Sequence, residues 1–136
     1  MADNVELVRE GFEALERGGI EEMLLFIHPE FETTTPPGLA VEPDTYRGHE
    51  GLRRYFDSFY EVMDSVRFIP DEFIEVGERV VVPVRVVARG KETGIEAAQS
   101  VFQVWSLRDE QAIRVEVFAT REEAMNAAAR AGGAAT

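Results

Sequence analysis

Length, composition and charge already limit what this protein is. Its 136 residues, of which 45% are hydrophobic, fit a single globular domain spanning residues 1–136. A formal net charge of -12 repels phosphate backbones and anionic bilayers, so we expect neither a nucleic acid nor a membrane as partner. The chain has no cysteine, which excludes disulfides, thiolate metal ligands and a cysteine nucleophile. Because the first residues are charged and lack an apolar signal core, we expect a cytoplasmic protein.

The N-terminal part of the chain predicts two helices and a short strand. Apolar residues at helical spacing indicate a helix over residues 3–17, which a Gly-Gly pair ends. A shorter helix is expected over residues 20–27, because the His-Pro pair that follows disfavours helical dihedrals. Residues 31–34 are then interpreted as a short strand.

A proline-rich stretch and a long helix occupy the middle of the chain. Residues 35–47 contain three prolines and no hydrophobic period, so we interpret them as a surface loop that serves as a lid or a rim. Residues 48–63 carry an apolar stripe at helical spacing, which predicts a long helix. The stripe is mostly aromatic and includes Tyr55, Phe56, Phe59 and Tyr60, so this helix is expected to cover a wide surface.

From Val66 onward the hydrophobic period is two, which indicates β-strands. The strand candidates are residues 66–76, 79–89, 95–107 and 112–119, and a last helix begins at Thr120 with a capping-box pattern. Helices followed by antiparallel strands indicate an α+β fold. Because a long meander twists, we expect a curved antiparallel sheet wrapped around the long helix, forming a cone-shaped barrel with a central cavity.

Three segments carry a family resemblance: GIEEMLLFIHPEF (19–31), YRGHEGLRRYF (46–56) and VFQVWSLRDEQAIRVEVF (101–118). With the order of the elements, they resemble a SnoaL-like domain of the nuclear transport factor two-like superfamily, which has the fold of ketosteroid isomerases and polyketide cyclases. The resemblance implies the cone-shaped fold, whereas the family's activities range from isomerases, cyclases and epoxide hydrolases to non-catalytic binders. One departure is the last turn, where relatives usually have Asp-Gly and this chain has Asp109-Glu110-Gln111.

The resemblance also orients the strands. In related ketosteroid isomerases the penultimate strand carries a cavity-facing acid, and Gln103 matches that position. If the last turn takes four residues, Gln103 lies opposite Glu116, and Trp105 lies opposite Arg114. The expected inner face then includes Val84, Val101, Gln103, Trp105, Arg114, Glu116 and Phe118.

Glu116 and Gln103 are the candidate catalytic residues. An apolar cavity disfavours a charged carboxylate, which suits Glu116 to acid/base chemistry. Gln103 is expected to donate a hydrogen bond to a substrate carbonyl or enolate oxygen. The alternative is that Gln103, Glu116 and Arg114 satisfy one another and do no chemistry. The predicted ligand-binding residues are Trp105, Arg114, Val101, Phe118, Val84, Phe56, Phe59 and Tyr60.

We therefore expect a SnoaL-like binding protein or enzyme for a small apolar molecule of polycyclic, terpenoid or polyketide type. Whether it is an enzyme stays open, with isomerase, cyclase or hydrolase chemistry as the options. Thr35 replaces the general base of ketosteroid isomerases, and residues 99–103 lack the Arg and Asp of epoxide hydrolases, so neither activity is expected. We expect no cofactor and no metal, because His28 and His49 have no further ligands at metal spacing.

The outer sheet face is expected to be apolar, with Val81, Val87, Phe102, Val104, Val115 and Val117 on it. An exposed patch of this kind predicts a homodimer through the outer sheet face. The alternative is that the C-terminal helix covers part of the patch. The same feature supports a second hypothesis for function, a non-catalytic dimerisation or interaction module with a closed cavity.

Overall fold

The computed structural model describes residues 3–36, 38 and 44–134 of the chain. In this part it contains the helices α1 (Asn4–Met23), α2 (Gly48–Val62) and α3 (Arg121–Ala134), and a short 3-10 helix, η1 (Leu24–Phe26). The strands are β1 (Ile27–Thr35), β2 (Asp44–Arg47), β3 (Met63–Pro70), β4 (Ile74–Val76), β5 (Arg79–Gly90), β6 (Glu96–Arg108) and β7 (Gln111–Phe118). None of the helices in the described part of the chain combines the length and the apolar character needed to cross a bilayer.

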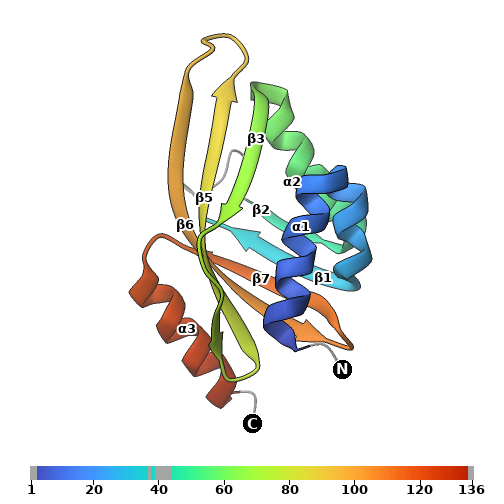
Figure 1. The fold of residues 1–136 in the computed structure, drawn as a ribbon, viewed down its shortest axis with the longest axis vertical. Helices are drawn as coiled ribbons and strands as arrows, with labels where there is room; N and C mark the ends of the chain where they lie inside the picture. Colours follow the sequence, from blue (N-terminus) through green and yellow to red (C-terminus); the bar gives the residue numbers. More distant parts are fainter. Residues whose placement is uncertain (1–2, 37, 39–43, 135–136) are drawn as a thin grey trace.

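One mixed sheet organises the fold. Its strand order is β2-β1-β7-β6-β5-β3, and β4 pairs with β5 beyond the end of β3. All the strand pairs are antiparallel except β1 with β7, which run parallel. Figure 1 shows α1 and α2 on one face of the curved sheet and α3 on the other, with the β5–β6 hairpin extending beyond the helices. The predicted α+β fold, a curved sheet around a long helix, is confirmed.

Two predicted boundaries in the first half were wrong, whereas the predicted helix break was right. Gly19, with a φ of 76° and a ψ of -164°, interrupts α1 and divides it into two helical segments, as the Gly-Gly pair predicts. The second segment continues from Ile20 through η1 to Phe26, close to the predicted end of the short helix, and β1 begins earlier than predicted, at Ile27, because parallel pairing with β7 extends the strand. Part of the predicted loop over 35–47 is β2, which pairs with β1; residues 37 and 39–43 of that loop lie outside the described residues.

The sheet is covered by apolar side chains on both faces. The larger core lies between α1, α2 and the inner face of the sheet, and includes Phe12, Phe56 and Trp105. On the outer face, Val81 and Val104 are fully buried against the small side chains of α3. The alternative expectation, that the C-terminal helix covers part of the outer face, is therefore confirmed, because α3 covers Val81 and Val104 of the predicted patch.

The register of β7 differs from the prediction. Leu107 pairs with Ala112 as expected, but the next pair is Ser106 with Arg114, so Ile113 is an extra residue in β7. This β-bulge shifts the alternation of every following residue by one. Trp105 consequently lies opposite Val115, and Gln103 lies opposite Val117.

The bulge reverses the two faces of β7. Val115 and Val117 face inward and line the interior, which corrects the prediction that they belong to the outer patch. Glu116 pairs with Val104, and Arg114 pairs with Ser106, on the outer face of the sheet. The predicted inward orientation of Arg114, Glu116 and Phe118 was therefore wrong.

Candidate functional site

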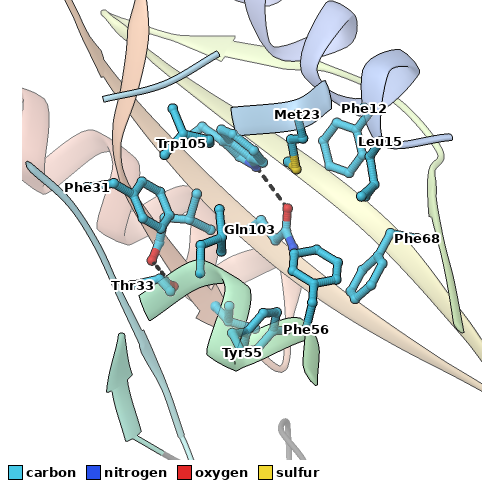
Figure 2. Close-up of a pocket in the computed structure, with 14 residues that line it drawn as sticks. Phe12, Leu15, Met23, Phe31, Thr33, Tyr55, Phe56, Phe68, Gln103 and Trp105 are labelled. Carbon is cyan, nitrogen blue, oxygen red and sulfur yellow. Dashed lines mark hydrogen bonds between the residues drawn. The ribbon is translucent and has the colours of Figure 1, made fainter. Parts of the chain in front are cut away.

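A small internal cavity of about 40 Å³ lies between α1, α2 and the inner face of the sheet (Figure 2). It lies where the central cavity of the cone-shaped fold was expected. Most of its walls are aromatic or aliphatic, and Thr33, Tyr55, Gln103 and Trp105 bring polar groups to them. Its lining consists of Phe12, Leu15, Met23, Ile27, Phe31, Thr33, Leu52, Tyr55, Phe56, Phe68, Gln103, Trp105, Val115 and Val117.

The cavity is much smaller than a typical ligand site. A water molecule takes up about 30 Å³ of liquid, and small-molecule sites usually measure roughly 300–1,000 Å³. Aromatic rings fill the remaining cone: Phe12 packs on Trp105 with 5.4 Å between ring centroids, and Phe56 packs edge-on against Phe68 at the same distance. A polycyclic ligand therefore enters only if some of these side chains move.

Gln103 is held in one orientation by its neighbour on the same strand. The indole Nε1 of Trp105 donates a hydrogen bond of 2.8 Å to Oε1 of Gln103. Because an indole nitrogen only donates, the amide oxygen must face it, and the amide NH2 group must face away. Figure 2 shows this nitrogen directed towards Phe56. Among the described residues it has no hydrogen-bond partner, so it is a fixed donor at an apolar cavity.

Two further polar side chains reach the cavity. The hydroxyl of Thr33 donates to the backbone oxygen of Val115 at 2.7 Å, which uses its proton within the sheet. Tyr55 packs edge-on against Phe56 and Phe59, and no hydrogen bond of its hydroxyl is found in the described part of the chain. Burial raises the pKa of Tyr55 well above its ordinary value, so at neutral pH the hydroxyl is a donor and not a base.

The cavity lining contains no carboxylate, imidazole, amine or guanidinium group among the residues that the structure describes. Glu116 was predicted to be the acid/base group here, but it lies on the opposite side of the sheet. The predicted contact between Gln103 and Glu116 is absent for the same reason, since Glu116 lies opposite Val104. The cavity can therefore bind and polarise an oxygen atom of a ligand. None of its described lining residues has a carboxylate that could transfer a proton.

The other predicted ligand residues fall into four groups. Phe56 and Trp105 line the cavity as expected. The core residues Val84, Val101 and Phe59 are buried beside the cavity without lining it. Tyr60 is 46% exposed, and it lines a separate groove on the surface. Arg114 and Phe118 face away, and Arg114 lines an outer hollow of about 240 Å³ together with Glu116.

Several lining residues were missed by the sequence predictions. Phe31 and Thr33 alternate along β1 and therefore point to the same side of the sheet. Phe12 belongs to the apolar stripe of α1, and Phe68 comes from β3. The period and spacing of apolar residues in the sequence identify these residues only as part of the core. They meet at one cavity because of the way the two helices lie over the sheet.

No group of three or more His, Asp or Glu side chains lies close enough to hold a metal ion in the described residues. His49 instead contacts the backbone oxygen of Ile27 through Nε2 at 2.8 Å, and His28 bonds through Nδ1 to the backbone N–H of Glu30. Both imidazoles thus hold local backbone structure next to β1.

Comparisons with known proteins agree with this architecture. A family model described as a SnoaL-like domain matches residues 8–115. Among the curated proteins the chain has no significant match.

Three solved structures illustrate the similarity. An NTF2-like protein of unknown function from Burkholderia pseudomallei K96243 is 27% identical, with a TM-score of 0.76, covering 93% of this chain and 97% of that one. TerC, co-crystallised with polyporic acid, is also 27% identical, with a TM-score of 0.75 and coverage of 92% and 99%. A putative SnoaL-like polyketide cyclase from Jannaschia sp. CCS1 is 18% identical, with a TM-score of 0.69 and coverage of 93% and 91%, and it shows the shared fold alone.

Proposed function

Because this chain belongs to the SnoaL-like domain family, we propose that it binds a small, flat aromatic or polycyclic molecule that carries a carbonyl oxygen. The ligand lies between α1, α2 and the inner face of the sheet. The observation that carries the proposal is the amide NH2 of Gln103, which Trp105 holds towards the cavity and which has no partner in the described residues. A carbonyl oxygen is the acceptor that would satisfy this donor.

The walls of the cavity suit an aromatic ligand. The rings of Phe12, Phe31, Phe56 and Trp105 offer both faces and edges to a flat molecule, and such contacts add to the gain from apolar burial. Since the described lining contains no charged group, a ligand with a charge at its inner end would lose its hydration without a counter-charge. A neutral carbonyl compound is therefore favoured over a carboxylate.

The amide NH2 of Gln103 also suits one role in catalysis, the stabilisation of a developing negative charge on oxygen. A hydrogen bond to a carbonyl oxygen strengthens when that oxygen becomes an enolate, so Gln103 would stabilise the intermediate of an isomerase or cyclase reaction. Such a reaction also needs a base, and the described lining offers none. Binding is therefore the function that the geometry supports best, with isomerase- or cyclase-like chemistry as its extension if the ligand or the solvent supplies the base.

The comparison with TerC supports the ligand class. TerC was co-crystallised with polyporic acid, and it matches this chain over nearly its whole length. Polyporic acid ionises at neutral pH, so the neutral 4-acetylbiphenyl, which has two rings and a single carbonyl group, is the probe that matches the uncharged lining. Biphenyl is the matched control, because it has the rings without the oxygen.

Isothermal titration and thermal-shift measurements test the proposal. We expect 4-acetylbiphenyl to bind and to raise the melting temperature, and biphenyl to bind at least several-fold more weakly, since it leaves the donor of Gln103 unpaired. Equal affinity for 4-acetylbiphenyl and biphenyl would contradict the role of Gln103. No binding of 4-acetylbiphenyl would favour the second candidate function.

That second candidate is an interaction module with a closed interior, and the 40 Å³ cavity is the observation in its favour. The predicted homodimer through the outer sheet face belongs to it and stays a prediction. The part of this face that α3 leaves free contains Val87, Ala98 and Ser100, with the half-buried Phe102 beside them. Sedimentation velocity decides this point: a monomer at all accessible concentrations would contradict the dimer.

A further inference from the structure

A second hollow lies on the surface directly beside the internal cavity. This entrance groove measures about 290 Å³ and runs between α1, α2 and β3. Its walls include Ile20 and Tyr60, which do not reach the cavity. Leu15, Phe56 and Phe68, in contrast, line both the entrance groove and the cavity. The two spaces therefore adjoin and share these three side chains as a common wall.

We infer that the entrance groove and the cavity are two halves of one ligand site, and that Leu15, Phe56 and Phe68 form the gate between them. The inference rests on the proposed function, and it specifies the ligand further. The carbonyl end of the ligand passes the gate and reaches Gln103, while an apolar ring at the other end stays in the entrance groove. The groove by itself approaches the lower limit of about 300 Å³ that is usual for small-molecule sites, whereas the cavity alone does not.

The gate is on the side of the cavity that opens most easily. Phe68 belongs to β3, which is an edge strand with a single neighbour, and both Phe68 and Leu15 are only half-buried. Edge strands and half-exposed side chains move at lower cost than those packed on all sides. On the opposite wall Phe31 is 2% exposed and Ile27 is fully buried (Figure 2 shows Phe31 opposite Phe68). Rotation of the Phe68 ring is thus the smallest change that joins the two spaces.

The rim of the entrance groove fixes its width and its polarity. Glu16 on α1 and Arg67 on β3 form an ion pair of 3.0 Å that links the two walls. Asp57 adds a carboxylate to the same rim. A ligand whose outer end is an apolar ring fits between these groups. An anionic outer end would be repelled, because the rim has two carboxylates and only one guanidinium group. The site therefore selects an elongated, neutral aryl ketone or quinone-type molecule.

The gate can be tested without any ligand, because Trp105 is the only tryptophan and lies in the cavity. Acrylamide, a small neutral quencher, reports how readily solvent molecules reach it. We expect Phe68→Val and Leu15→Ala each to raise the acrylamide quenching constant several-fold over the wild-type protein. Phe31→Val is the matched control, because it removes the same volume from the opposite wall, and it should raise the constant much less. All measurements are made well below the melting temperature of each variant.

Two outcomes of this measurement would overturn the inference. One is that Phe68→Val and Leu15→Ala leave the quenching constant at the wild-type value. The other is that Phe31→Val raises it as much as they do. Both are independent of whether any carbonyl ligand binds, so a failure of the gate is distinct from a failure of the proposed function.

The ligand part of the inference is tested with two ketones. 4-Acetylbiphenyl has one ring more than acetophenone, and that ring is the part assigned to the entrance groove. Tyr60→Ser should lower the affinity for 4-acetylbiphenyl by roughly threefold to tenfold, because an aromatic contact is lost. It should leave the affinity for acetophenone unchanged. Equal effects on both ketones, or none on either, would show that the groove does not hold the second ring. Failure of the wild-type protein to bind 4-acetylbiphenyl would instead contradict the proposed function.

Discussion

Trp105 and Gln103 are joined by a hydrogen bond of 2.8 Å between side chains on the same face of β6, and this bond decides which end of the amide faces the cavity. The two residues are one strand repeat apart, so the indole can reach back along the strand to the amide oxygen. A glutamine that is otherwise free to flip thereby becomes a donor of fixed direction.

Replacing Gln103 by leucine removes this donor and leaves the indole N–H of Trp105 without its acceptor. An unsatisfied buried donor costs roughly 1–3 kcal/mol, so the free energy of unfolding should fall by that amount in urea titrations. Binding of 4-acetylbiphenyl should fall to the level of biphenyl. An unchanged preference for the ketone would show that another group holds the carbonyl oxygen.

Gln103→Glu separates the two roles of the side chain. A carboxylate still accepts the hydrogen bond from Trp105, but it presents an oxygen to the ligand in place of NH2. Ketone binding should be lost at neutral pH and should return at acidic pH, where the protonated acid donates again. Titrations of the variant at several pH values check this, with the wild-type protein as the control whose binding stays constant.

Glu116→Gln should leave ketone binding unchanged, because Glu116 lies on the outer face of the sheet opposite Val104. Calorimetric titration of the variant beside Gln103→Leu gives the comparison directly. A loss of binding as large as that of Gln103→Leu would mean that β7 presents its other face to the cavity.

Stability should decrease at alkaline pH through Tyr55. Burial raises its pKa above that of the unfolded chain, so the hydroxyl is neutral in both states below about pH 10, and only the unfolded chain ionises readily above it. The contribution of Tyr55 to the free energy of unfolding is therefore fully present below about pH 10. It is lost as the pH rises further, and at pH 11 the loss is about 1.4 kcal/mol. Urea unfolding of Tyr55→Phe should show a smaller loss between pH 9 and pH 11. The exposed Tyr60→Phe is the control and should behave as the wild-type protein does.

Glu110→Gly should stabilise the fold. Asp109 and Glu110 form the turn between β6 and β7 with φ of 53° and 64°, a conformation that glycine adopts without steric cost. We expect a gain of roughly 0.5–1 kcal/mol in the free energy of unfolding. Glu92→Gly, in the exposed turn between β5 and β6, is the control; Glu92 does not have a positive φ, so no gain is expected there.

Ala128→Asp should destabilise the protein strongly, because Ala128 is fully buried where α3 packs on the outer face of the sheet. An unpaired buried carboxylate costs at least about 3 kcal/mol, which thermal unfolding detects easily. Ala129→Asp, one residue further along α3 and exposed, is the matched control. Similar melting temperatures for both variants would show that α3 does not cover the sheet in solution.

The fold was largely predictable, because amphipathic periods of 3.6 and 2 mark α2 and the long strands. The orientation of β7 was not predicted correctly, although its sequence contained the signal. Arg114 and Glu116 alternate with Val115 and Val117, which by itself places the valines inside. The length of the turn and the family resemblance argued for the opposite face, and both arguments assumed a regular ladder. A single extra residue, Ile113, invalidates that assumption.

The candidate site was predicted only in part for a different reason. Gln103, Trp105 and Phe56 were identified because a polar residue and large rings stand out on a strand and a helix that face each other. The small size of the cavity depends on how the rings pack in three dimensions, and no local pattern reports that. The contribution of Phe68 likewise depends on β3 lying at the edge of the sheet beside α1.

The parallel pairing of β1 with β7 has a consequence for how the chain folds. The hydrogen bond from Thr33 to Val115 joins residues 82 positions apart, and β7 is the last strand to leave the ribosome. Until then β1 and β2 have only each other, and an isolated two-stranded ribbon is at best marginally stable in water. The pairing that joins β1 and β2 to the rest of the sheet therefore forms only after β7 is made, and completion of the domain waits for this strand.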